Sequence, residues 1–573
     1  MNTSVFPYIG IITLISVIKL FYALGTELIP DEAYYWEWSR RLDLSFYDQG
    51  PGVGLYIRLF TSILGNTNFA LKLAAVSAGF GTSVFLIYTS RLLQFGKKGL
   101  FWTVLLSQLI PGFFGGSIFI MHDSPLLLSW SAALYFTVHY IFKKDVLSLY
   151  LMFLSLGFGA LSKHSMVFFA LSLIVWLILN PKQSALLKNP HFYAGLILAG
   201  AVFSPVILWN IQHHWDNVDA IIHLRSSGGV YSKKWNTGEY IGGQLLAMSP
   251  LWFIASAALL FLPLGSFISR MKQERLKYIF LRGQDNSESA FSFLYLNASV
   301  LLLYFLFMSF TKHIQANWTF PAYLPMILIS AAFLEKRGES LKDAFIFRAF
   351  QIGTFFALFF NVFSFFSVPI VKLFNIPLET YSVPGYRQAG FREAAEEIRK
   401  LRDRTDPNAE IIANKYQDAA ILSWFLPGQP FVQSLNIMQK NQYNYWLRLE
   451  KGKNYFLGFI EDKTCEKSFI FFQSYLELMF EEVKEFPEQD ILVDGKTVKR
   501  YQAWHLKNFR ESWAEKSFNY MENGMVYAYM PVLLSAAGAS DSKDSSANFT
   551  KALELLNSYY SRKGEIECSI FRK

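Results

Sequence analysis

Charged residues are scarce in this chain of 573 residues. They make up 17% of it, against about 25% in an average soluble domain. The shortage is confined to the first two thirds, where long apolar runs follow one another, whereas the last third has the composition of an ordinary soluble protein. The chain is therefore predicted to combine a membrane part with a soluble part.

Several familiar signatures are also missing. No basic region precedes the first apolar run and no small-residue cleavage site follows it, so the run ending at Leu24 is predicted to be a retained span. No Walker loop, dinucleotide-binding glycine motif or nucleophile elbow occurs in a fitting context, which argues against nucleotide-driven chemistry. The two cysteines, Cys465 and Cys568, define no disulfide framework, although one bridge between them stays open if both lie outside the cytoplasm.

The net charge of +9 would by itself also suit a nucleic-acid-binding protein. The basic residues, however, form short clusters between apolar runs, which is typical of loops that orient a membrane protein. We therefore expect no nucleic-acid partner.

Long apolar segments predict about eleven transmembrane helices, because a span needs about 20 mostly apolar residues. The segments cover residues 6–25, 69–90, 100–120, 124–142, 146–162, 165–180, 191–210, 240–263, 289–310, 318–334 and 345–369. The two segments within 146–180 form one apolar stretch interrupted by SKHS, and we expect two shorter helices that meet at this polar turn.

The loops between these spans favour a cytoplasmic N-terminus. In that orientation the inner loops hold fifteen Lys and Arg in about 57 residues, and the outer loops hold eight in about 83. Positive residues concentrate in cytoplasmic loops, so the bias has the expected sign. An odd number of spans then places everything after residue 370 outside.

The predicted fold class is a polytopic α-helical membrane protein with a C-terminal α/β extracytoplasmic domain. Residues 1–375 form the membrane domain, with a first outer loop at 26–68, and residues 376–573 form the outer domain. In the outer domain FREAAEEIRKLRDRT has helical spacing, and AEIIANKY and QPFVQSLN resemble strands. DILVDGKTVKRYQAWHL predicts a hairpin around its Asp-Gly pair, and a short helix is expected at 549–561.

The first outer loop contains the densest polar segment, IPDEAYYWEWSRRLDLSFYDQGPG, from Ile29 to Gly52. Its aromatic residues are typical of a loop at headgroup depth, which is the alternative interpretation. The adjacent carboxylates Asp31 and Glu32 fit that alternative less well, because carboxylates held against apolar surface are costly without partners or a task. Asp31 is therefore a candidate functional residue.

Four further polar clusters are predicted on the same side of the membrane. The first is HDSP with Asp123, for which helix capping ahead of a proline is the alternative. The second is SKHS with Lys163, for which a snorkelling lysine is the alternative. The third contains Asn210, Gln212, His213, His214 and Trp215. The fourth contains Lys312, His313, Gln315, Asn317, Trp318 and Tyr323.

The adjacent histidines His213 and His214 lack the spacing of a helical metal-binding pair, so no metal ligand is predicted. All five clusters fall on one face, and this convergence favours an outward-facing active site.

The order of these motifs resembles the polyprenyl-phosphate-sugar-dependent glycosyltransferases of the GT-C fold, in particular bacterial relatives of protein O-mannosyltransferases and of the lipid A aminoarabinose transferase. The resemblance covers roughly residues 8–335 and rests on PDEAYYW, YDQGPG, HDSP, LSKHS, LWNIQHHW and ANWTFPAYLP. The later segment YQDAAILSWFLPGQP resembles the outer domain of the same group.

The resemblance implies an enzyme that moves a sugar from a polyprenyl-phosphate donor to a lipid, glycan or protein acceptor on the non-cytoplasmic face, with inversion at the anomeric carbon. It implies a multi-pass protein of the bacterial inner membrane, among membrane lipids, with its C-terminal domain in the periplasm. A divalent metal ion bridging carboxylate and phosphate is compatible with this chemistry but not required.

The resemblance also implies residue roles. Asp31, accompanied by Glu32, matches the acidic residue that serves as general base or positions the acceptor, and Asp123 matches the acidic position of the second outer loop. Relatives often have an acidic and then a basic residue where this chain has Asp48 and Gln49, so Lys163 becomes the better candidate for the donor phosphate. The other predicted substrate-binding residues are His122, His164, Gln212, His213, Lys312, Asn317 and Trp318.

Two other functions stay open from the sequence. A lipid or sugar transporter or flippase would suit the many spans and the intramembrane Lys163, but it should place polar groups at the bilayer midplane and show internal repeats. A non-catalytic anchor for the outer domain would leave the acids of the first loop unexplained.

Overall fold

The computed structural model describes residues 4–219, 236–268, 286–335, 341–435, 441–462, 476–477 and 479–510. These residues belong to two compact units. The membrane unit comprises Met1–Thr26 and Tyr35–Phe363, and the C-terminal unit comprises Glu27–Tyr34 and Ser364–Lys573. Both cysteines and the helix expected at 549–561 lie outside the described residues.

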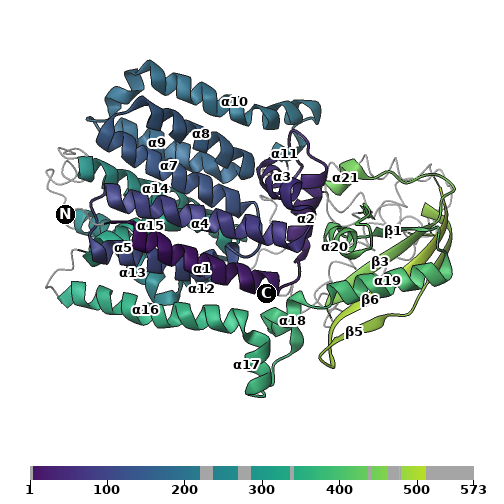
Figure 1. The fold of residues 1–573 in the computed structure, drawn as a ribbon. Coiled ribbons are helices and arrows are strands. Elements are labelled where there is room, and N and C mark those ends of the chain that lie inside the picture. Colours follow the sequence, from purple (N-terminus) through teal and green to yellow (C-terminus); the bar gives the residue numbers. More distant parts are fainter. Residues whose placement is uncertain are drawn as a thin grey trace. The chain divides into compact units, whose positions relative to one another are not determined.

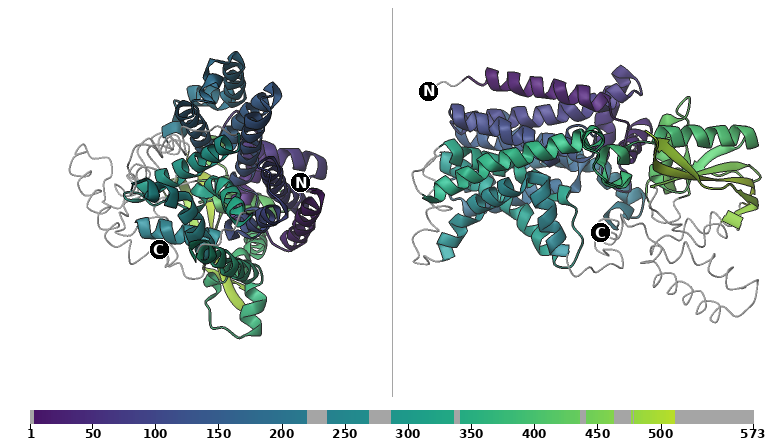
Figure 2. Two further views of the ribbon diagram at one scale, coloured as in Figure 1. Left: turned by 90° about the vertical axis from the view of Figure 1, so that its left-hand side faces the viewer. Right: turned by 90° about the horizontal axis from the view of Figure 1, so that it is seen from below.

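The membrane unit is a bundle of helices that run side by side (Figures 1 and 2). Its helices are α1 (Phe6–Leu24), α3 (Gly52–Leu64), α4 (Asn68–Leu92), α5 (Lys97–Leu109), α6 (Pro111–Gly116), α7 (Asp123–Lys143), α8 (Val146–Ser162), α9 (Val167–Leu179), α10 (Pro190–Gln212), α11 (Asp216–Asp219), α12 (Asn236–Met248), α13 (Pro250–Ile268), α14 (Asn286–Ser309), α15 (Phe320–Glu335) and α16 (Leu341–Phe365). Helix α2 (Pro30–Arg40) begins in the C-terminal unit and ends in the membrane unit. Each of the eleven predicted segments is helical.

The apolar helices make this chain a multi-pass membrane protein. Among the described residues, seven helices are each long and apolar enough to cross a membrane, and a bent pair could supply an eighth span. Only 17% of the spanning window of α1 is buried, against 72% for the window that contains α15. Helix α15 therefore lies inside the bundle, whereas the apolar side chains of α1 face outward, as lipid contact requires.

Two predicted spans are broken. The single helix expected at 240–263 is wrong: α12 and α13 bend by 106° at the intervening residue, Ser249, where φ is 86°. Pro250 follows and begins α13, a position that suits proline because the first backbone N–H of a helix has no partner within the helix. The segment expected at 100–120 likewise divides into α5 and α6 at Pro111. The predicted break at SKHS is confirmed, since α8 ends at Ser162 and α9 begins at Val167.

The C-terminal unit contains a mixed sheet. Its strands are β1 (Glu410–Ala413), β2 (Gln433–Ser434), β3 (Tyr455–Asp462), β4 (Phe480–Glu485), β5 (Gln489–Val493) and β6 (Lys496–Phe509), and its helices are α17 (Ser367–Leu373), α18 (Pro384–Gln388), α19 (Phe391–Thr405), α20 (Tyr416–Phe425) and α21 (Tyr443–Trp446). The strand order is β2-β1-β3-β6-β4, with β5 also paired to β6. Strand β1 is parallel to β2 and β3, whereas β6 is antiparallel to its neighbours.

The expected helix and hairpin of this unit are confirmed as α19 and as β5 with β6. Asp494 and Gly495 form the turn with φ of 54° and 73°, the left-handed pair that a two-residue hairpin turn needs. Strands β3 and β4 were not predicted, although Gly452 precedes β3 and Pro487 follows β4.

Candidate functional site

Asp123 is the centre of a buried polar cluster in the membrane unit. It is the first residue of α7, two positions before Pro125, and is 7% exposed. A carboxylate at this position is favoured by the amide groups and the dipole of the helix N-terminus. Burial nevertheless demands partners for a charge.

Two side chains from distant segments supply these partners. Lys163 Nζ donates to Asp123 Oδ1 at 2.7 Å, and Asn317 Nδ2 donates to Asp123 Oδ2 at 2.8 Å. Lys163 is 4% exposed and lies in extended backbone where α8 ends, while Asn317 belongs to a short 3-10 turn at Ala316–Thr319. The structure thus brings together three of the predicted site residues and fixes both carboxylate oxygens.

His122 extends this cluster toward α2. Its Nε2 lies 3.5 Å from Asp123 Oδ2, and its Nδ1 is 2.7 Å from the hydroxyl of Tyr35. In the sequence, Tyr35 is one of several aromatic residues of the first outer loop and nothing distinguishes it from the others. The missed role has no local signature, because it depends on a contact between residues 87 positions apart.

Gln49 and His164 form a second polar contact. His164 directly follows Lys163 in the chain. Gln49 is 1% exposed, and its Oε1 lies 2.8 Å from His164 Nδ1. The side-chain nitrogen of Gln49 is buried and has no hydrogen-bond partner within the part of the chain that the structure describes. This amide is therefore an unused hydrogen-bond donor in the loop between α2 and α3.

Glycines allow the loop that carries Gln49 to approach α8. A Cβ added to Gly50 would collide with the carbonyl oxygen of Leu161, and one added to Gly52 would collide with Ser162. Backbone-to-backbone packing of this kind is a common reason for glycine outside turns. The loop is thereby held against the end of α8, one residue before Lys163.

Asn217 also holds the same loop in place. Its Nδ2 donates to the carbonyl oxygens of Phe46 at 3.0 Å and Tyr47 at 2.8 Å. Trp209 donates to Asp43 at 3.3 Å and stacks on His213 at 4.0 Å. His213 therefore packs against Trp209, which contacts the loop, and not against Asp123. In Figure 1, α3 and α11 lie at the end of the bundle opposite the start of α1.

The remaining predicted residues lie apart from this cluster. Gln212 is exposed at the end of α10. Trp318 donates to Gln315 at 3.2 Å and packs against Phe305. Lys312 and Asp48 are half-buried and make no hydrogen bond to Asp123. In the described ranges, no three His, Cys, Asp or Glu side chains are grouped as metal ligands.

Asp31 and Glu32 occupy the first turn of α2, in the part of it that belongs to the C-terminal unit. Glu32 Oε2 accepts a hydrogen bond from the backbone nitrogen of Ile29 at 3.2 Å, which caps the helix start. Tyr34 anchors this turn: its hydroxyl accepts from the Gln442 amide at 3.1 Å, and its ring lies 4.5 Å from that of Tyr416. Burial, and to a smaller extent the charge of Glu32, raises the pKa of Asp31.

Three comparisons with known proteins agree with this architecture. Residues 48–209 match the family described as dolichyl-phosphate-mannose-protein mannosyltransferase. The lipid A galacturonosyltransferase RgtD of Rhizobium johnstonii is 23% identical over 243 residues, which cover 40% of this chain and 50% of that protein. The chain thus spans about half the length of this curated relative.

The fold is similar to that of ArnT from Cupriavidus metallidurans. The structure bound to undecaprenyl phosphate superposes with a TM-score of 0.56 and the apo structure with 0.57, each at 13% identity and each covering 87% of this chain and 98% of that one. The chain has the fold of GT-C glycosyltransferases, a polytopic helical membrane part followed by a small mixed sheet. The resemblance predicted from the motifs is confirmed.

Proposed function

We propose that this chain is an integral membrane glycosyltransferase that moves a sugar from a polyprenyl-phosphate donor to a lipid, glycan or protein acceptor. The observation that carries the proposal is the Asp123 cluster, in which Lys163 and Asn317 hold both carboxylate oxygens of a buried acid at the end of the bundle. A fixed cation among oriented donors is the arrangement that stabilises charge developing on a leaving group.

Recognition of the donor phosphate is assigned to Lys163 and Gln49. When the bond between the anomeric carbon and the phosphate oxygen breaks, the electron pair leaves with the polyprenyl phosphate. Asp123 keeps the Lys163 ammonium in place, and the unused amide of Gln49 can donate to a phosphate or sugar oxygen. ArnT, with its bound undecaprenyl phosphate, supports a lipid phosphate as the donor class.

Activation of the acceptor is assigned to Asp31. The acceptor oxygen forms its bond to the anomeric carbon from the face opposite the leaving phosphate, and its proton passes to the Asp31 carboxylate. The raised pKa of Asp31 makes it a stronger base than an ordinary aspartate. If the acceptor is itself a phosphate, no proton has to be removed, and Asp31 orients the acceptor.

The proposed location is the bacterial inner membrane, with the C-terminal unit on the periplasmic side. The support is the distribution of Lys and Arg, since the outer loops contain far fewer of them per residue than the inner loops. A lipid-linked donor on that face needs no nucleotide, in keeping with the absent nucleotide-binding motifs.

A flippase is the competing function, and the bent pair α12 and α13 favours it, because discontinuous helices are common in transporters. The test is sugar transfer in membranes that contain the protein and a panel of radiolabelled polyprenyl-phosphate sugars. We expect label to appear in an acceptor with release of polyprenyl phosphate. Movement of an intact labelled lipid between leaflets, without transfer from any donor, would instead establish the flippase.

A further inference from the structure

Another buried lysine of the membrane unit is Lys19 of α1. Lys19 is 4% exposed, its Nζ donates to Gln108 Oε1 at 3.2 Å, and it lies 4.5 Å from the centre of the Phe114 ring. Among the described residues no carboxylate contacts it. A buried charge without a counter-charge is costly, and an ionisable residue inside a span is usually there for a function.

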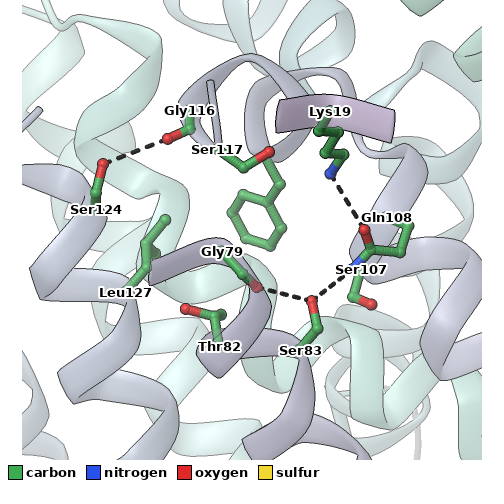
Figure 3. Close-up of a pocket in the computed structure, with 11 residues that line it drawn as sticks. Lys19, Gly79, Thr82, Ser83, Ser107, Gln108, Gly116, Ser117, Ser124 and Leu127 are labelled. Atoms are coloured by element: carbon green, nitrogen blue, oxygen red, sulfur yellow. Dashed lines mark hydrogen bonds between the residues drawn. The ribbon is translucent and has the colours of Figure 1, made fainter. Parts of the chain in front are cut away.

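A pocket opens beside this lysine. It is small and lies between α1, α4, α5, α6 and α7. Figure 3 shows Lys19 and Gln108 pointing toward each other above Ser83. The lining consists of Lys19, Gly79, Thr82, Ser83, Ser107, Gln108, Phe113, Gly116, Ser117, Ser124 and Leu127.

Most donors around the pocket are already used. The hydroxyls of Thr82, Ser83, Ser107, Ser117 and Ser124 each donate to a backbone carbonyl oxygen. The side-chain nitrogen of Gln108 donates to Ser83 Oγ at 2.7 Å. An ammonium carries three donors, of which Gln108 takes one, so Lys19 is the group able to serve a ligand that brings acceptor oxygens and a negative charge.

The depth of Lys19 in the membrane indicates what kind of molecule carries the negative charge of the ligand. Lys19 lies five residues before the end of α1 at Leu24, which is about 8 Å along the helix axis, in a hydrocarbon layer about 30 Å thick. A lysine that merely snorkels directs its ammonium to the membrane surface. Lys19 instead turns its ammonium inward to Gln108, toward a pocket also lined by Phe113 and Leu127.

We propose that this pocket binds an oxyanion, a phosphate or carboxylate, carried by a membrane amphiphile, with Lys19 as the counter-charge and Gln108 orienting it. Ser124 of the lining directly follows Asp123 in the chain, so the pocket adjoins the cluster described above. Anion binding by Lys19 does not require sugar transfer, and the two proposals can therefore fail separately.

The test is equilibrium binding to the purified full chain in a neutral detergent. The probes are dioleoyl phosphatidic acid, oleate and the uncharged dioleoylglycerol. We expect at least one anionic probe to bind about tenfold more tightly than dioleoylglycerol, with this preference lost in Lys19→Met and retained in Lys19→Arg. Preference for phosphatidic acid identifies a phosphate as the natural group, and preference for oleate identifies a carboxylate.

Two further variants keep the test decisive. Gln108→Glu places a carboxylate beside Lys19, so it should remove the preference for anionic probes even if Lys19→Met does not fold. Lys144→Met is the matched control, because Lys144 also donates to a glutamine oxygen, of Gln183, and lies 5.0 Å from the ring of Tyr140, but does not line the pocket. The proposal is overturned if Lys19→Met and Gln108→Glu keep the preference, or if Lys144→Met loses it equally.

Discussion

The Lys163 ammonium lies 2.7 Å from a carboxylate oxygen of Asp123, and both side chains are almost fully buried. The two charges therefore depend on each other, since either one alone would be an uncompensated charge in a low-dielectric site. In the proposed reaction the pair acts as a unit that presents Lys163 to the donor phosphate. Asp31, which belongs to the other unit of the chain, is then the residue assigned to the acceptor.

Breaking this pair should cost both stability and activity. We expect Lys163→Met or Asp123→Asn alone to destabilise the protein by about 3–5 kcal/mol, because one buried charge loses its partner. The double variant Lys163→Met with Asp123→Asn should recover most of the stability but none of the transfer activity. Thermal unfolding and transfer assays on purified protein measure both. Additive losses of stability in the double variant would show that the two groups do not interact.

The loop that carries Gln49 should not tolerate a side chain at Gly50. The added methyl of Gly50→Ala would meet the Leu161 carbonyl, so the loop must shift away from α8 and displace Gln49 from His164. We expect at least a tenfold fall in kcat/KM, equivalent to about 1.4 kcal/mol. Gly115→Ala is the control, because a Cβ there meets nothing within 4 Å. Equal activity of the two variants would exclude the packing role of Gly50.

Gln49 should act on donor binding. Gln49→Leu removes the unused amide donor and the acceptor for His164, so we expect the KM for the lipid-linked sugar to rise about tenfold, a cost of about 1–2 kcal/mol. Initial rates at varied donor concentration measure this effect. Gln351→Leu, on the exposed side of α16, makes the same replacement away from the site and should leave KM unchanged. A variant of Gln49 with normal KM but reduced kcat would reassign the residue.

The fall of kcat/KM at low pH should follow the ionisation of Asp31. A base must be ionised, so activity falls as the pH drops through its pKa, which for Asp31 lies above the ordinary value of about 3.9 because of burial and of Glu32. Glu32→Gln removes the neighbouring charge, so the fall should move to lower pH. The measurement is kcat/KM against pH for both proteins. A fall that stays in place or moves to higher pH would contradict the assignment.

Local chemistry marked the three residues of the Asp123 cluster as candidates. A proline directly after HDS, a lysine in the SKHS turn and an asparagine before Trp318 each marked an end of a helix in an otherwise apolar sequence, and the structure brings Asp123, Lys163 and Asn317 together. Their meeting itself could not be predicted, because the three segments are far apart in the chain and no periodic pattern encodes their packing.

Other features escaped prediction for identifiable reasons. Tyr34 contacts Gln442 across 408 positions, so nothing in the first loop indicates that its acidic turn belongs with the C-terminal unit. The break between α12 and α13 was missed, although the pair Ser249–Pro250 inside an apolar run marks it. Lys19 carried the same signal as Lys163, a charge within a span, and was overlooked because its segment matched a spanning helix so well.

The most direct test of the account is sugar transfer by purified protein in liposomes. Wild-type protein and Asp31→Asn would each receive a labelled polyprenyl-phosphate sugar and an extract of envelope acceptors, and both products would be quantified. The account predicts equal amounts of glycosylated acceptor and free polyprenyl phosphate with the wild type, and at least a hundredfold less of both with the variant, about 2.7 kcal/mol of barrier. Full transfer by a correctly folded Asp31→Asn protein would contradict it.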